Sequence, residues 1–511
     1  KYCFDKFLTI LNTVSNMEHQ DKLDLPQITA FNCIKAIFVE AKLSEACSPY
    51  FPIALEYSLK YFKSDIWALR NCSLMLFTSL QNRIFGKIGK NISARLFFTK
   101  YEGIDEMLLQ ILRNSIENDN EKKTDMESTI LVLSILMCLK QTPGYNGLDP
   151  FIVEVVKCLE NKNWKIRDMA ARTISGLVDD THVDMLPLME ECSVQNQNKL
   201  HGHLLAMKNI LTIGHNHHMP SKVDDMIKNV LNNSQEFITL NPSFVTSKAY
   251  LDVVSLVFAN SDTEITTKYK ENVVSTIGNY FIHNFSSDSD ISGIKGLCIA
   301  TALEFLLKNE THDNINSLLQ LGLESARYEV QFEAIKYIES NGTTLIGDED
   351  LNNIGKKLTE LLLEKKTLVT LKPSIIRAIK TLSITQLKFD ELVTVFKNSN
   401  SKAFKLAAIE SLGDWVENSQ HVNKIWDLIQ EYLNDSTDEL FRMAVLNCLV
   451  NCSKKISDVR VIMEICNYLQ DDDSDIREVA AVYLNEYMQN TVSPAMQRTS
   501  DTVACDIYEF I

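Results

Sequence analysis

The sequence predicts an all-α fold, an α-solenoid of the armadillo or HEAT type. With 511 residues, the chain exceeds the roughly 300 residues at which a single hydrophobic core stops growing, which indicates several domains or a repeat array. Hydrophobic residues make up 45% of the chain, whereas the 16 glycines and 10 prolines are few for a β-rich protein of this size. A short motif that recurs along the chain favours the repeat array.

The motif is a polar, often acidic turn followed by an apolar residue, a long polar or cationic residue and, three positions later, a small or apolar residue. It is clearest in Asp471–Ala481. Its copies place the long polar or cationic residue at Arg70, Arg167, Gln331, Lys405, Arg442 and Arg477. The last three are 37 and 35 residues apart, near the lower end of the roughly 40-residue HEAT unit, and the 74 residues before Lys405 leave room for a degenerate unit near Leu371.

This motif has a physical explanation. Turn carboxylates at the start of the second helix accept hydrogen bonds from its free N–H groups, and the small residue lets two helices approach closely. We expect the arginines at 167, 442 and 477 to pair with an acidic turn of the next repeat. By regularity, the chain divides into a basic helical segment (1–120), irregular helical repeats (121–320) and HEAT-type repeats (321–511).

The sequence contains no nucleotide-binding, hydrolase or metalloprotease motif, so we predict a protein that is not an enzyme and has no cofactor of its own. The longest apolar stretch, Ile130–Leu139, is too short to span a membrane. The 12 cysteines are scattered without a CxxC pair, which is typical of reduced thiols in a cytosolic or nuclear protein, and we predict a cytoplasmic location.

Histidines are dense between positions 201 and 218, where they raise the alternative of a zinc or copper site. They are His201, His203, His215, His217 and His218. No carboxylate or cysteine lies among them to complete a coordination shell, so we interpret them as helix and loop residues and predict no metal.

The charge pattern is more informative. The whole chain has a net charge of −16, yet the window from Tyr57 to Tyr101 has a net charge of +7, with aromatic residues interleaved. We predict that six of its cations bind RNA phosphates or an acidic partner, an ordinary solvated basic face being the alternative. They are Arg70, Arg83, Lys87, Lys90, Arg95 and Lys100.

The same window resembles the THADA family. The resemblance rests on Phe62–Phe77 and Arg83-Ile84-Phe85-Gly86, with the flanking segments Ala30–Phe38 and Ser93–Phe98, and it continues in Asn198–Leu205 and Tyr328–Val330. It places the family core in residues 1–120. The signature residues that we expect to be structural are Trp67, Asn71, Phe77, Phe85, Gly86, His201 and Gly202. The family's Arg-Arg-Ser-Ala-Gly-Leu-Pro motif is absent, and the chain begins just after its expected place.

The resemblance implies a non-catalytic scaffold that binds an FtsJ-type methyltransferase and tRNA for 2′-O-ribose methylation at position 32 of the anticodon loop. It also implies that S-adenosylmethionine is held by the partner subunit. The Asn- and Lys-rich character favours the fungal branch of the family. The alternative is a protein-interaction solenoid without RNA binding, for transport or calcium-pump regulation as implied for the animal member.

Overall fold

A computed structural model describes residues 2–13, 25–86, 91–117, 123–178, 186, 189, 192–213, 221–260, 264–285, 293–310, 312–342, 348–382, 387–434 and 438–491. By its internal contacts the chain divides into two compact units, unit 1 (Lys1–Tyr280) and unit 2 (Phe281–Ile511), with the boundary inside one helix. We predicted three segments from the character of the sequence, and a division by contacts does not test those boundaries.

The elements of unit 1 are α1 (Tyr2–Leu11), α2 (Pro26–Val39), α3 (Ser44–Cys47), α4 (Phe51–Tyr61), α5 (Trp67–Phe85), β1 (Ile92–Ser93), α6 (Ala94–Lys100), α7 (Ile104–Glu117), α8 (Lys123–Leu136), β2 (Leu139–Lys140), α9 (Asp149–Cys158), α10 (Trp164–Leu177), α11 (Gln197–Ile213), α12 (Ser221–Asn232) and α13 (Phe244–Asn260), followed by α14 (Glu264–Phe285), which crosses the boundary.

The elements of unit 2 are α15 (Gly293–Asn309), α16 (His312–Glu324), α17 (Tyr328–Asn341), α18 (Asp348–Leu363), α19 (Lys372–Thr381), α20 (Phe389–Asn398), α21 (Lys402–Leu412), the 3₁₀ turn η8 (Gly413–Trp415), α22 (Ser419–Asn434), α23 (Glu439–Lys455), α24 (Val459–Asn467) and α25 (Ser474–Thr491).

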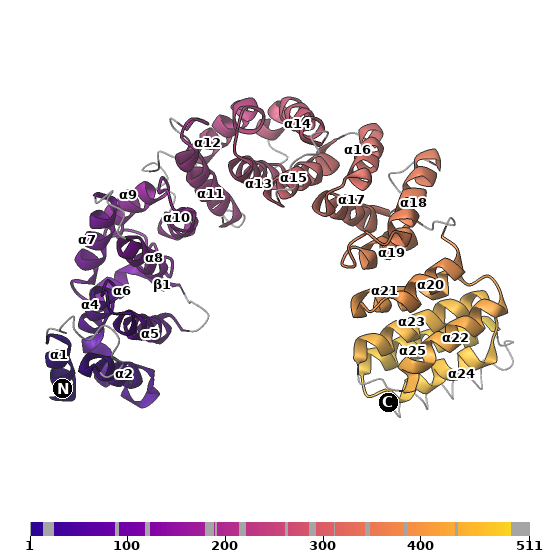
Figure 1. The fold of residues 1–511 in the computed structure, drawn as a ribbon, viewed down its shortest axis with the longest axis horizontal. Coiled ribbons are helices and arrows are strands. Elements are labelled where there is room, and N and C mark those ends of the chain that lie inside the picture. The colour runs from indigo at the N-terminus through magenta and orange to yellow at the C-terminus, as the bar shows by residue number, and fades with distance from the viewer. Residues whose placement is uncertain are drawn as a thin grey trace. The chain divides into compact units, whose positions relative to one another are not determined.

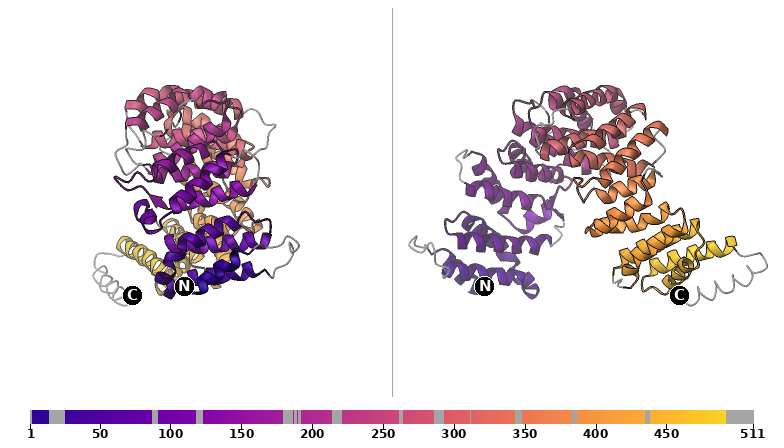
Figure 2. Two further views of the ribbon diagram at one scale, coloured as in Figure 1. Left: turned by 90° about the vertical axis from the view of Figure 1, so that its left-hand side faces the viewer. Right: turned by 45° about the vertical axis from the view of Figure 1, so that its right-hand side comes forward.

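Within each unit the helices form two layers of antiparallel pairs (Figures 1 and 2). In unit 1, α8, α10, α11 and α13 pack on one another in chain order, and α7 and α9 cover α8 and α10. In unit 2, α15, α17, α19, α21, α23 and α25 form the corresponding succession, covered by α16, α18, α20, α22 and α24. Because one pair cannot bury its own apolar face, each pair is stabilised by its neighbours. The predicted all-α solenoid architecture is confirmed.

One small departure from an all-helical chain occurs in unit 1. The two-residue strands β1 and β2 pair in parallel, with Ile92 opposite Leu139 and Ser93 opposite Lys140. Next to this pair, the Ser93 and Thr142 hydroxyl oxygens lie 2.7 Å apart. The contact ties the start of α6 to the loop that follows β2.

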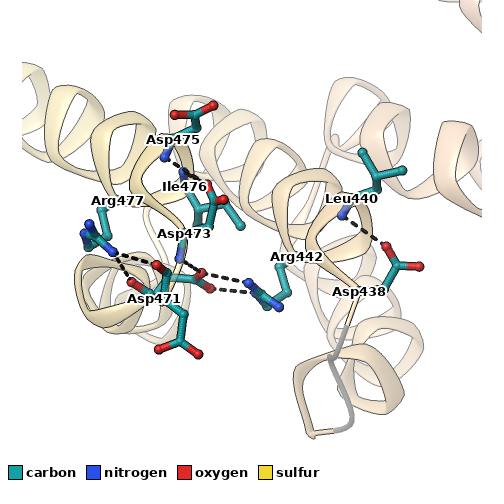
Figure 3. A network of polar contacts seen from close by, with 9 residues as sticks. Asp438, Leu440, Arg442, Asp471, Asp473, Asp475, Ile476 and Arg477 are labelled. Atoms are coloured by element: carbon teal, nitrogen blue, oxygen red, sulfur yellow. Dashed lines mark hydrogen bonds and ion pairs between the residues drawn. The ribbon is translucent and has the colours of Figure 1, made fainter. Parts of the chain in front are cut away.

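The turn before each second helix has a repeated hydrogen-bond pattern, which Figure 3 shows for its last copy. Nη1 of Arg477 donates to the backbone carbonyls of Asp471 (2.6 Å) and Asp472 (3.0 Å), six and five residues earlier. The Asp471 carboxylate accepts from the N–H of Asp473 (2.9 Å), whose own carboxylate accepts from Asp475 and Ile476 in the first turn of α25. The turn and the helix start are therefore held from both sides.

We call the residue that reaches back the clamp residue. Arg167 makes the same two bonds to the carbonyls of Asn161 and Lys162, and Arg70 makes them to those of Ser64 and Asp65. Gln331 makes one of them, to the carbonyl of Ser325 at 2.8 Å. The side chain six residues before the clamp residue accepts from the backbone N–H two positions on; these acceptors are Ser64, Asn161, Ser325, Ser399 and Asp471. The predicted repeats thus share one hydrogen-bonding register.

The predicted role of the arginines is correct at Arg442 and wrong at Arg167, and at Arg477 it is untested, because residues after 491 lie outside the described ranges. Arg442 pairs with Asp471 of the next repeat through Nε (2.8 Å) and Nη2 (3.0 Å), as predicted (Figure 3). Arg477 and Arg167 instead bind carbonyls of their own turns, and Arg167 reaches the next repeat only at neutral partners on α11. Turn carbonyls lack helical partners, so a nearby guanidinium satisfies them first.

The degenerate unit expected near Leu371 exists. Helix α19 begins at Lys372 and packs between α17 and α21 as the second helix of a pair. The N–H of Ile375 bonds to the carbonyl of Leu371, the same bond that Arg477 makes to Asp473. Ile375 thus takes the clamp position, where its apolar side chain offers no donor to the turn.

We expect that Arg477→Ala lowers the free energy of unfolding by about 1–2 kcal/mol, because two turn carbonyls lose their donor. Arg477→Gln should restore about half of that loss, since Gln331 makes one such bond at the matching position. Urea unfolding followed by far-ultraviolet circular dichroism measures both. Equal stability of the Ala and Gln variants would contradict the clamp.

Helix α11 approaches α9 more closely than a side chain permits. A Cβ atom on Gly202 would lie 1.8 Å from the carbonyl oxygen of Leu159, at the end of α9. This is a backbone contact, so no side chain can move aside to relieve it. The signature glycine is therefore a close-packing residue.

Gly202→Ala should lower the free energy of unfolding by about 3 kcal/mol, the upper part of the usual range for overpacking. Gly176→Ala in α10 is the matched control, because its Cβ would meet Leu139 only at 3.5 Å and alanine favours a helix. The urea midpoints of both variants give the comparison; a midpoint for Gly202→Ala equal to that of Gly176→Ala would refute the close approach.

Candidate functional site

The basic window folds into α4, α5 and α6. Helix α5 buries Leu69, Leu76 and Phe77 along one side and ends at Gly86, whose φ of +74° favours glycine. The last turn of α5 carries Arg83. A cation at this end of the helix is favoured by the partial negative charge of the free carbonyls.

Arg83 faces an open cleft of about 510 Å³ in unit 1. The cleft is formed by the end of α5, by β1 and α6, and by the connection from α2 to α4. Its lining residues are Phe38, Glu45, Cys47, Ser48, Phe51, Arg83, Ile84, Ile92, Leu96, Phe97, Lys100 and Tyr101.

The floor of the cleft is aromatic and fully packed. Phe38, Phe51, Phe97 and Tyr101 are all buried. Phe51 and Phe97 meet edge to face with ring centroids 6.3 Å apart, and Phe97 meets Tyr101 in the same way at 5.4 Å. Because these rings pack against one another, they give a rigid apolar wall and leave no open ring face on which a nucleobase can stack.

The rim combines charge with an exposed apolar side chain. Arg83 Nη2 donates to the carbonyls of Glu40 and Ala41, both at 3.3 Å, and Lys100 Nζ lies 5.2 Å from the centroid of the Tyr101 ring. Leu96 is 68% exposed. The two cations Arg83 and Lys100 outnumber Glu45, the one acidic residue among the lining residues. This arrangement therefore suits a ligand that offers acidic groups beside an apolar one.

The structure brings two of the six predicted cations, Arg83 and Lys100, to this cleft. Arg95 is exposed on α6 but does not line it. Arg70 is the clamp residue of its turn, so the expectation that it faces a ligand gives way to a structural role. Lys87 and Lys90 lie outside the described residues.

Two signature residues are not where we expected them. Trp67, predicted to pack in the core, is 64% exposed, and Asn71 is exposed as well. They lie four residues apart on α5, on the side opposite Leu69 and Leu76, which contact the neighbouring helices. Phe77 and Phe85 are buried, as packing residues should be.

The sequence also contained a signal that we did not use. Trp164 lies three residues before the clamp residue Arg167, as Trp67 lies three before Arg70, and it too is 64% exposed. Tyr328 has the same position before Gln331 and is exposed. Aligning the turns would have predicted these exposed rings.

His201 and His203 are buried in the core of unit 1. His201 Nδ1 accepts from Nε of Arg167 at 3.2 Å, and His203 Nδ1 lies 3.4 Å from the N–H of Met189 and 3.5 Å from the sulfur of Cys192. Burial lowers the pKa of each histidine to about 4. Across the described ranges, no group of three or more His, Cys, Asp or Glu side chains is placed to hold a metal ion. His215, His217 and His218 lie outside those ranges.

We predict a pH dependence from these two histidines. Their folded pKa of about 4 lies below the ordinary value near 6.5, so the unfolded chain takes up protons first on acidification. Stability should be complete above about pH 6.5 and fall towards pH 4, by up to about 2 kcal/mol per histidine at pH 5. Urea midpoints at pH 7.5 and 5.0 measure this loss. It should shrink in the His201→Gln/His203→Gln variant; an unchanged loss would rule out these histidines as its source.

The buried thiols are poor nucleophiles. Burial raises the pKa of Cys158 to about 12 and that of Cys192 to about 11, which keeps both protonated at neutral pH. In the part of the chain that the structure describes, no helix is both long and apolar enough to cross a membrane.

Two family models match the first 210 residues of the chain. Residues 1–68 match the family model described as THADA/TRM732, DUF2428, and residues 70–210 match the model of the Trm732 C-terminal TPR repeats. The two matches meet in the first turn of α5, next to Arg70.

Curated relatives agree. The tRNA (32-2′-O)-methyltransferase regulator trm732 of Schizosaccharomyces pombe is 28% identical over 264 residues, which cover 47% of this chain and 18% of that protein. The THADA regulators of the same methyltransferase from Canis lupus familiaris and Homo sapiens are 31% and 27% identical, and the matched segments cover 37% and 45% of this chain. The matched segments thus cover less than a fifth of the length of each of these relatives.

Among solved structures, a chain from the study of how Kap95p binding switches the loops of RanGDP aligns with a TM-score of 0.59. The alignment covers 92% of this chain and 62% of that chain at 11% identity. At this identity the likeness supports the helical-repeat fold alone.

Proposed function

Because the chain belongs to the THADA/Trm732 family, we propose that it is part of a non-catalytic regulator of a tRNA 2′-O-methyltransferase. In this proposal it binds an FtsJ-type methyltransferase and tRNA, and it positions the anticodon loop for methylation at position 32. The methyl donor, S-adenosylmethionine, is held by the methyltransferase. The observation that carries the proposal is the match of residues 1–210 to domains of this family.

The cleft in unit 1 is the proposed contact with the methyltransferase. Its apolar wall, the exposed Leu96 and the cations Arg83 and Lys100 suit an acidic and apolar segment of a protein. The buried floor rings offer no stacking face, which favours a protein over RNA at this place. A regulator of this kind contributes by orienting two reactants, a contribution that alone lowers a barrier by several kcal/mol.

We expect Arg83→Glu/Lys100→Glu to weaken binding of the purified methyltransferase at least tenfold, because two attractive charges become repulsive. Lys268→Glu/Lys270→Glu on α14 is the matched control: it makes the same change of net charge at two exposed cations of unit 1 outside the cleft. Isothermal titration with the methyltransferase, and filter binding with tRNA over a salt series, measure the two contacts separately.

The outcomes are distinct. Normal enzyme binding with lost tRNA binding in the cleft variant would assign the cleft to RNA, with a steep salt dependence. Normal binding of both would remove the cleft from the function. If the wild-type chain binds neither, it is a protein-interaction solenoid of another kind. Circular dichroism of each variant excludes unfolding as the cause.

A further inference from the structure

Unit 2 has a groove of about 470 Å³ over α21, α23 and α25. The clamp register explains which residues it presents. Glu410, Asn447 and Val482 each lie five residues after the clamp position of their turn, which is Lys405, Arg442 or Arg477, so they form a row across three successive helices. Asn451 and Glu486 form the next row, nine residues after theirs.

The groove combines apolar side chains with free amides. Val482 is 48% exposed, and Val479 beside it is half-buried. Asn447 and Asn451 lie one turn apart on α23, and neither amide has a hydrogen-bond partner among the residues that the structure describes. Each amide can both donate and accept, as the backbone of an extended peptide requires.

The charges of the groove indicate the charge of a ligand that would bind there. Glu410, Glu478 and Glu486 line it, and within the described chain none of the three forms an ion pair. Of the two lysines in the lining, Lys380 is already paired with Asp414 at 3.1 Å. The other lysine, Lys454, is a single cation against these three unpaired carboxylates, so negative charge is in excess in the lining. Such a surface attracts cations and repels phosphates.

We infer that this groove docks an extended, basic segment of another protein, in which lysine or arginine alternates with apolar residues. Its apolar side chains meet Val482, and its cations meet the glutamates one turn before and after it on α25, while side chains that alternate along an extended chain allow both contacts. Asn447 and Asn451 then hold the peptide backbone. The inference concerns unit 2, whereas the family matches that support the proposed function end at residue 210.

The test uses the full chain and a fluorescein-labelled peptide of 12 residues, in which lysine and arginine alternate with valine and serine. Fluorescence anisotropy should show binding that weakens with salt. Glu478→Lys/Glu486→Lys should weaken it at least tenfold. Asp427→Lys/Glu464→Lys, with the same charge change on the outer helices α22 and α24, should bind as the wild type does.

Two further measurements sharpen the result. Lys454→Glu should tighten binding, since it removes the unpaired cation of the lining, and the peptide with glutamate in place of its cations should not bind. The inference fails if the wild-type chain does not bind the basic peptide. It also fails if the groove and control variants lose affinity equally, because the peptide would then bind only through attraction to the net negative charge of the chain.

Discussion

The solenoid depends on how each turn satisfies its own backbone. Between two antiparallel helices, several carbonyl groups lie beyond the reach of helical hydrogen bonds, and leaving them buried without donors costs free energy. A long donor side chain in the first turn of the second helix solves this locally, as Arg70, Arg167 and Arg477 show. The side chain also ties the start of the second helix to the end of the turn. One contact therefore fixes both the turn and the direction of the next helix.

The register that follows decides which positions remain for function. The residue three after the clamp residue packs in the interior, as Ala170 and Ala480 do. Positions three before it, or five and nine after it, face outward, so they differ freely between repeats without cost to the core. Trp67, Glu410 and Val482 occupy such positions. Surfaces of different chemistry can in this way be built on one scaffold.

The sequence was sufficient for the solenoid fold, for the repeats at Arg442 and Arg477 and for the degenerate unit that became α19. It was not sufficient for Trp67, because periodicity shows that two residues share a face but not which face a neighbour covers. Arg70 was misread for a related reason: a cation in a basic window looks available until its turn carbonyls are placed. The cleft joins Glu45, Arg83 and Leu96, which lie on separate segments, so only the fold brings them together.

The cleft in unit 1 and the groove in unit 2 differ in the chemical groups that they offer to a partner. In unit 1, cations surround a wall of buried rings, and selectivity there rests on acidic groups placed beside an apolar side chain. In unit 2, unpaired carboxylates line the same groove as free asparagine amides, which can hold a peptide backbone whatever its side chains are. Electrostatic complementarity of this kind sets association rates and rejects wrong partners more than it adds affinity. In the proposed function, specificity arises by this route, since the contribution of the chain lies in which molecules it brings together.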